Sequence, residues 1–145
     1  MEVLVIGHAN MYLLKKMIAP DIEKYFNFCG FLENYNTLKS KIQTSRIYIL
    51  PSISEGMPNS LMEAMALEMP CIASNVGGVP ELIEHNVEGL LFEPNNPKKL
   101  AELIRLLLED ENLQKKLGIN ARKKMVNEFN WNQIIKKFEI LYGKL

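Results

Sequence analysis

Short apolar segments alternate with amphipathic segments along the chain. Five apolar runs that end in turn residues predict strands over residues 3–6, 25–29, 47–50, 71–73 and 89–92. Runs with so little polar alternation are typical of parallel strands that are covered on both faces. Apolar residues at helical spacing predict helices over residues 11–18, 38–43, 60–67, 97–108, 112–116, 121–128 and 131–145. This order predicts an α/β fold with a parallel sheet of about five strands and helices on both faces.

Composition narrows the class of protein. The 145 residues are 48% hydrophobic and 23% charged, which argues against a disordered chain. Lys and Arg balance Asp and Glu at 17 each, so we expect no nucleic-acid partner. The two cysteines, Cys29 and Cys71, indicate neither a disulfide framework nor a zinc site and favour a cytoplasmic protein. We expect no signal peptide and no membrane span.

The segment after the third predicted strand carries the candidate chemistry, because ligands of open α/β sheets bind at the carboxyl ends of strands. Gly56 allows the backbone to approach a ligand closely. Asn59 or Ser60 is expected to cap the following helix. The N–H groups of Ser60, Leu61 and Met62 would then be free to bind a phosphate or diphosphate.

Two simpler interpretations stay open at this point. Ser60 and Glu63 have the spacing of a capping box, in which the glutamate bonds back to the backbone and needs no ligand. Glu55 is either a solvated loop carboxylate or an acceptor for the hydroxyls of a ligand.

Seven residues separate Glu55 from Glu63, and the surrounding segment resembles the E-x7-E segment of retaining GT-B glycosyltransferases of group 1 (family 4). The similarity continues through residues 70–81, with their Gly-Gly-Val-Pro-Glu sequence, through residues 88–92 and through residues 129–131. It covers nearly the whole chain and is strongest over residues 50–94.

The resemblance implies the C-terminal, donor-binding half of a GT-B fold, without the first strand of that half. Residues 1–145 would then form a single Rossmann-like domain that binds a nucleotide-sugar, with C-terminal helices over residues 112–145. The implied activity moves a sugar from a nucleotide-sugar to a glycan or a lipid-linked acceptor and retains the anomeric configuration. No metal or other cofactor is implied.

The resemblance also assigns roles to residues. Glu55 is the implied catalytic residue and contacts the hydroxyls of the donor sugar, whereas Glu63 binds the ribose. The loop that contains Gly30 and Phe31 lines the base. The remaining implied donor-binding residues cradle the sugar and the diphosphate: Gly56, Met57, Pro58, Asn59, Ser60 and Leu61.

Several departures from the family pattern matter for function. The Arg and Lys that grip the diphosphate in the family have no counterpart here, and nothing in the sequence supplies an acceptor-binding half. The alternative is therefore a non-catalytic nucleotide-sugar-binding or assembly subunit of a split glycosyltransferase, which works with an acceptor-binding domain or subunit outside this chain. The missing strand would leave a gap between the strands at residues 3–6 and 47–50.

Three local features complete these expectations. Glu68 stands where the family usually has a glycine, so a left-handed backbone there would cost roughly 1 kcal/mol or more. Residues 113–127 carry five basic side chains and no acid, which is either a solvated face or a peripheral contact with an anionic inner membrane surface. The apolar side of the last helix would fold onto the sheet, bind a partner or self-associate.

Overall fold

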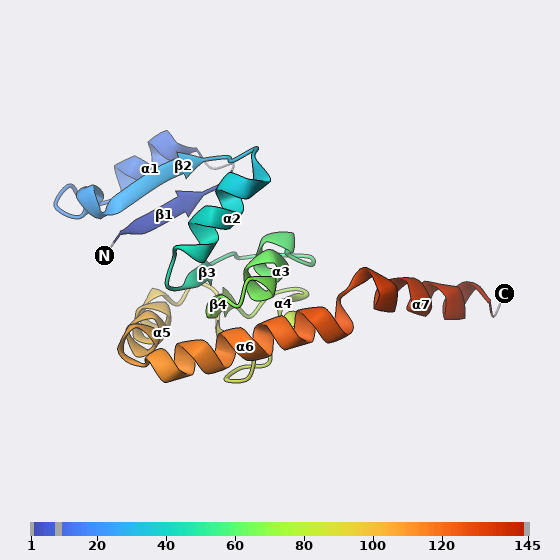
Figure 1. Cartoon of the computed structure of the whole chain (residues 1–145). Helices are drawn as coiled ribbons and strands as arrows, with labels where there is room; N and C mark the ends of the chain where they lie inside the picture. Colours follow the sequence, from blue (N-terminus) through green and yellow to red (C-terminus); the bar gives the residue numbers. More distant parts are fainter. Residues whose placement is uncertain (1, 8–9, 144–145) are drawn as a thin grey trace. The chain divides into compact units, whose positions relative to one another are not determined.

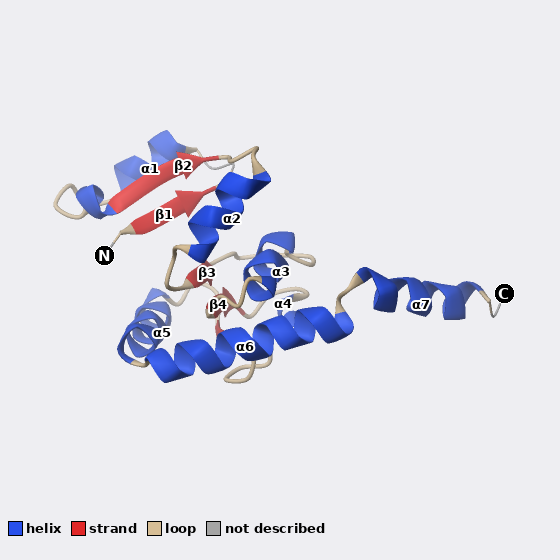
Figure 2. Ribbon diagram, viewed as in Figure 1, coloured by secondary structure: helices blue, strands red, loops and turns tan. Residues whose placement is uncertain are grey.

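The computed structural model describes residues 2–7 and 10–143, and the chain divides into two compact units, Met1–Lys41 and Ile42–Leu145. Strands and helices alternate through both units (Figure 1), and the strands are short relative to the helices (Figure 2). The α/β class with parallel strands, expected from the sequence, is confirmed.

The first unit contains two parallel strands and their connecting helix. Strand β1 (Val3–Ile6) pairs with β2 (Phe26–Gly30), and the register shifts between Val5 and Ile6. Between them lie helix α1 (Met11–Met17) and the short 3-10 helix η1 (Glu23–Tyr25), and α2 (Tyr35–Gln43) follows β2. None of the described residues before Ile42 is buried, so this pair of strands has little core of its own.

The second unit contains a three-stranded parallel sheet with the order β3-β4-β5. The strands are β3 (Tyr48–Leu50), β4 (Cys71–Ser74) and β5 (Leu90–Phe92). The helices are α3 (Asn59–Ala66), α4 (Val79–Leu82), α5 (Pro97–Glu109), α6 (Glu111–Glu128) and α7 (Trp131–Tyr142). Strand β4 lies in the middle of the sheet, and all four of its residues are buried.

The core of this unit forms where the sheet meets its helices. Ile72, Leu90 and Phe92 of the sheet pack with Leu103 and Leu107 of α5 and with Leu117 of α6. Helix α6 packs against α3, and the guanidinium of Arg122 donates a hydrogen bond to the carbonyl of Ala66, the last residue of α3. This packing fixes α3, and therefore the loop that precedes α3, against the sheet.

The strands do not join into the single sheet of about five strands expected from the sequence. They form two separate sheets, and β1 and β3 do not pair with each other. The edge of β3 away from β4 and one edge of β1 therefore carry no strand partner among the described residues. The sequence had placed the interruption at this position, between the strands at residues 3–6 and 47–50.

Other element predictions need correction. Helix α6 is continuous, whereas two helices were expected over residues 112–116 and 121–128. Gly118 is buried inside the helix, and the carbonyl of Glu68 leaves no room there for a side chain. Helix α4 was not predicted. The last helix ends at Tyr142 rather than at residue 145, and residues 144–145 lie outside the described residues.

The backbone of Glu68, in the second unit, has a φ of 61°. The left-handed position anticipated from the sequence is therefore present and is occupied by a non-glycine residue. Helix α7 exposes large apolar side chains along its length: Trp131, Ile135, Phe138, Ile140, Leu141 and Tyr142. Within the described part of the chain, no helix has the length and apolarity needed to cross a bilayer.

Candidate functional site

The loop between β3 and α3 lies at the carboxyl end of the parallel sheet and contains Glu55. The Glu55 side chain is partly buried, and the hydroxyl of Ser52 donates a hydrogen bond of 2.5 Å to its Oε1 atom. A bond of this length is typical of a hydroxyl that donates to a carboxylate. Ser52 was not singled out in the sequence, although its position three residues before Glu55 in a turn is the signal that could have identified it.

The start of α3 differs from the prediction that Asn59 or Ser60 caps the helix. The N-cap residue is Pro58, which is buried, and no side chain caps the helix. Proline is extended here (φ −73°, ψ 107°), and its carbonyl oxygen receives the first helical hydrogen bonds. The predicted caps are therefore wrong, and the capping box between Ser60 and Glu63 does not form.

The backbone N–H groups at the start of α3 that remain free for a ligand also differ from the predicted ones. The N–H groups of Leu61 and Met62 donate to the Pro58 carbonyl at 3.1 and 3.2 Å, so they are not available to a ligand as expected. The N–H groups of Asn59 and Ser60 have no partner among the described residues, and both residues are exposed. An anion at the positive end of the helix would therefore meet these two amides.

Tyr48 on β3 interacts with residues of the segment that begins α3. Burial raises the pKa of Tyr48 to about 12, and a side-chain interaction with Ser60 acts in the opposite direction. Neighbouring acidic groups raise the pKa further: Cys71, Glu63 and Glu55. The interaction with Ser60 connects β3 to the first turn of α3.

The turn between β4 and α4 lies directly against the Glu55 loop. The N–H of Gly78 donates to the carbonyl of Gly56 at 2.8 Å. A Cβ atom at Gly77 would overlap the carbonyl oxygen of Glu55, and one at Gly78 would overlap that of Gly56. Gly77 also has a φ of 52°, a conformation that side chains disfavour. The two glycines are therefore required for the close approach of these two loops.

The other predicted residues fall into different environments. Gly56 is exposed, and Met57 is 42% exposed at the surface of the same loop. The side chain of Leu61 is completely buried, so only its backbone lies near the loop. Gly30 ends β2 with a φ of 68°, and Phe31 follows it with 56% of its surface exposed. Gly30 and Phe31 belong to the first unit, whereas the structure brings the predicted residues of segment 55–63 together in the second.

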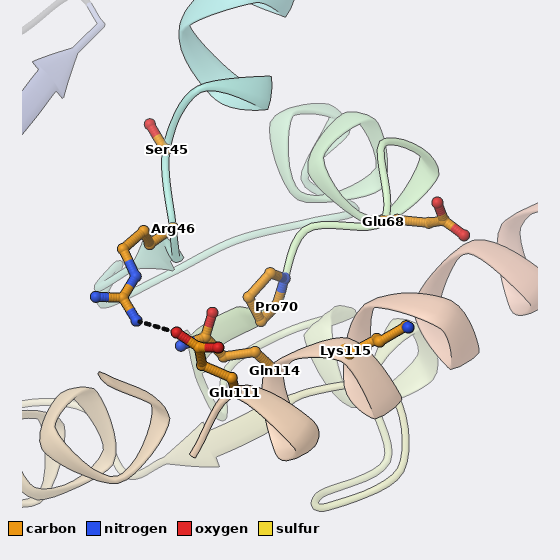
Figure 3. A pocket seen from close by; sticks show the side chains of 7 residues that line it. All are labelled: Ser45, Arg46, Glu68, Pro70, Glu111, Gln114 and Lys115. Carbon is orange, nitrogen blue, oxygen red and sulfur yellow. Dashed lines mark ion pairs between the residues drawn. The ribbon is translucent and has the colours of Figure 1, made fainter. Parts of the chain in front are cut away.

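A shallow depression of about 350 Å³ lies elsewhere in the second unit (Figure 3). Arg46 precedes β3 and Pro70 precedes β4, so the depression is at the amino ends of these strands, opposite the Glu55 loop. In its lining, an ion pair joins Arg46 Nη2 to Glu111 Oε1 at 3.7 Å (Figure 3). The full lining is Ser45, Arg46, Glu68, Pro70, Glu111, Gln114 and Lys115. It is therefore separate from the candidate site.

The sequence model of the family described as "Glycosyl transferases group 1" matches residues 1–124. The chain belongs to this family.

The chain is similar to parts of longer proteins. It is 33% identical over 112 residues to N-acetyl-alpha-D-glucosaminyl L-malate synthase of Bacillus anthracis, covering 77% of this chain and 29% of that protein. It is 35% identical over 137 residues to the amylovoran biosynthesis glycosyltransferase AmsK of Erwinia amylovora, covering 89% of this chain and 33% of that protein. The chain thus spans about a third of the length of these relatives.

Solved structures share the fold. The C-terminal domain of the group 1 glycosyl transferase LpcC from Francisella tularensis is 26% identical, with a TM-score of 0.78 over 90% of this chain and 70% of that one. Anabaena HepE in complex with UDP is 24% identical, with a TM-score of 0.90 over 99% of this chain and 41% of that one. The fold is accordingly that of the C-terminal half of GT-B glycosyltransferases.

Proposed function

We propose that this chain is the donor-binding part of a retaining, family 4 glycosyltransferase, and that it binds a nucleotide-sugar. One observation carries the proposal: Glu55, the free amides of Asn59 and Ser60, and Glu63 follow one another at the carboxyl end of β3. The complexes of HepE with UDP and with UDP-glucose support a nucleotide-sugar as the ligand of this fold.

Each part of the segment has a role that its chemistry suits. The amides of Asn59 and Ser60 bind the diphosphate, since exposed N–H groups at a helix N-terminus favour anions. Glu55 accepts hydrogen bonds from the hydroxyls of the donor sugar, and Glu63 accepts them from the ribose. Gly30 and Phe31 contact the base. These assignments follow the E-x7-E resemblance, residue by residue.

In the proposed reaction, the bond between the anomeric carbon of the sugar and the diphosphate breaks. A hydroxyl oxygen of a glycan or a lipid-linked acceptor forms the new bond to that carbon, its proton passes to the departing diphosphate or to water, and the nucleoside diphosphate leaves. The configuration at the anomeric carbon is retained. The N–H groups at the helix N-terminus stabilise the negative charge that develops on the leaving diphosphate, so the proposed reaction includes no metal ion.

A thermal-shift screen tests donor binding. The chain is heated with UDP, GDP or ADP and with the glucose conjugate of each, with and without EDTA. One of these nucleotides should stabilise the fold, by about 2.7 kcal/mol at one hundred times its Kd, and EDTA should not reduce the effect. If none of the six ligands stabilises the chain, donor binding is wrong. If stabilisation requires Mg²⁺ or Mn²⁺, the metal-free part is wrong.

The exposed apolar side of α7 favours a second candidate, a non-catalytic nucleotide-sugar-binding or assembly subunit of a split enzyme. Trp131 is 77% exposed and Phe138 is 53% exposed, and such a surface is typical of a helix that docks onto a partner. The partner would be the acceptor-binding domain or subunit. Sugar transfer by the chain alone would support an active enzyme. Transfer that begins only when a second polypeptide is added would support the split arrangement.

The basic residues of α6 bear on a peripheral contact with an anionic inner membrane surface. Lys115, Lys116 and Lys123 are exposed, whereas Arg122 bonds to the Ala66 carbonyl and Lys124 pairs with Glu88. We therefore base the proposed contact on the three exposed lysines, at about 1 kcal/mol per charge. Flotation with phosphatidylglycerol vesicles should recover the chain, and changing all three lysines to Glu should abolish recovery. Equal recovery of both proteins would exclude this contact.

A further inference from the structure

The carboxylate of Glu55 is held by a single short hydrogen bond. Ser52 Oγ donates to Glu55 Oε1 at 2.5 Å, and Ser52 is partly buried directly after Pro51. The other oxygen, Oε2, has no partner among the described residues. The hydroxyl of Ser52 therefore restricts the rotation of the carboxylate and leaves one of its oxygens for a ligand.

The backbone of Glu55 is packed against the turn between β4 and α4. Gly77 lies so close to the Glu55 carbonyl that no side chain fits between them. The Gly78 N–H bonds to the next carbonyl, that of Gly56, at 2.8 Å. The buried hydroxyl of Ser74 donates to the Leu50 carbonyl at 3.1 Å, which joins β4 to the end of β3 just before the loop.

The side chain of Glu55 is therefore held by a residue of its own loop, and its backbone is packed against the turn between β4 and α4. A carboxylate that recognises sugar hydroxyls selects for the sugar only if it is held in place before binding, because small displacements weaken such recognition strongly. We propose that Ser52 and Gly77 are positioning residues that hold Glu55 for the donor sugar and thereby set the preference for a nucleotide-sugar over the bare nucleoside diphosphate. This inference rests on the proposed function.

The test measures this preference as the ratio of two dissociation constants. The wild-type chain is titrated calorimetrically with UDP and with UDP-glucose, or with the GDP or ADP pair if the screen selects it. Ser52→Ala should lower the ratio of Kd for the bare nucleotide to Kd for its sugar conjugate at least five-fold, with the Kd of the bare nucleotide changed less than two-fold. Ser52→Thr restores a hydroxyl and should keep the ratio within two-fold of wild type.

Gly77→Ala should lower the same ratio at least five-fold, because the added methyl group displaces the Glu55 carbonyl. Gly118→Ala is the matched control, since it places a methyl group against another carbonyl, that of Glu68, away from the loop. The control should lower the melting temperature but keep the ratio. If Gly77→Ala does not fold, the Ser52 variants decide, because removing one hydroxyl from a partly buried loop position leaves the core intact.

The outcomes separate the inference from the function on which it rests. If the wild-type chain binds none of the nucleotides, the proposed function fails and the inference fails with it. If the wild type prefers the sugar conjugate and Ser52→Ala keeps that preference, the inference alone is overturned. It is also overturned if the wild type binds both ligands equally, or if Gly118→Ala lowers the ratio as much as Gly77→Ala does.

Discussion

Lys124 on α6 and Glu88 before β5 form an ion pair of 4.0 Å, in which only 16% and 13% of the two side chains are exposed. The same Glu88 oxygen accepts a hydrogen bond of 2.9 Å from the N–H of Glu84. Together these contacts hold the loop before β5 against α6. They give a structural reason for the glutamate of the Glu-Gly-Leu-Leu-Phe segment, which the sequence had linked only to a family resemblance.

Replacing Lys124 by Met should therefore lower the free energy of unfolding by about 1–2 kcal/mol, because it leaves the Glu88 carboxylate poorly solvated and unpaired. Lys123 is the neighbouring exposed residue, and Lys123→Met is the control, with an expected change within about 0.5 kcal/mol. Urea denaturation measures both values. Equal stability of the two variants would mean that the ion pair contributes nothing.

A substitution at Glu68 should raise the free energy of unfolding instead of lowering it. A φ of 61° destabilises the fold by roughly 1–2 kcal/mol when the residue is not glycine. Glycine removes this strain, but part of the gain is offset because glycine also increases the conformational entropy of the unfolded chain. Glu68→Gly should therefore stabilise the chain by about 0.5–1 kcal/mol. Asn86→Gly and Asn95→Gly are controls at φ values of 69° and 60°, and they should change stability little because asparagine tolerates this region. Stabilisation by the controls but not by Glu68→Gly would contradict this explanation.

Tyr48 predicts a loss of stability at high pH. Its pKa is raised from 10.0 to about 12 in the folded chain, so the unfolded chain loses this proton first as the pH rises. The contribution of this pKa shift to the free energy of unfolding is complete below pH 10 and is lost between pH 10 and 12. At pH 11 the loss is about 1.4 kcal/mol. The stability difference between wild type and Tyr48→Phe should shrink by that amount from pH 8 to pH 11.

A stability difference between wild type and Tyr48→Phe that stays constant from pH 8 to pH 11 would show that the phenol of Tyr48 is not held in its neutral form by the fold.

The two glutamates of the candidate site should differ in their effect on ligand binding. Glu55→Ala should remove the preference for the sugar conjugate and leave the Kd of the bare nucleoside diphosphate within about two-fold. Glu63→Ala should weaken both ligands equally, by about ten-fold, since both contain the ribose. Isothermal titration measures the four constants. The roles are wrong if Glu63→Ala affects only the sugar conjugate, or if Glu55→Ala weakens both ligands alike.

The order and parallel direction of the strands could be predicted because each strand is a nearly continuous apolar run, as in Cys71–Ser74, where every residue is buried. Local choices that depend on distant residues could not. The continuity of α6 was missed, and the Glu68 carbonyl requires a glycine at Gly118 inside this helix. Ser60 has the sequence of a cap, but Tyr48, twelve positions earlier, engages its side chain.

The same limit applies to the candidate site. Glu55 and Glu63 were found because their spacing lies within one segment. The contributions of Gly77 and Gly78 depend on two loops that meet only in the folded sheet, although their motif had been noted for its resemblance. Helix α4 was missed because four residues that include Pro80 carry too short a periodic pattern to recognise.

The proposed function requires that the start of α3 binds the diphosphate of a nucleotide-sugar. Amide NMR spectra of the labelled chain can be recorded during titration with the nucleoside diphosphate that stabilises it most. The N–H resonances of Asn59 and Ser60 should shift most, while that of the buried core residue Leu107 should not move. Unchanged Asn59 and Ser60 resonances at saturation, with shifts confined to other elements, would contradict it.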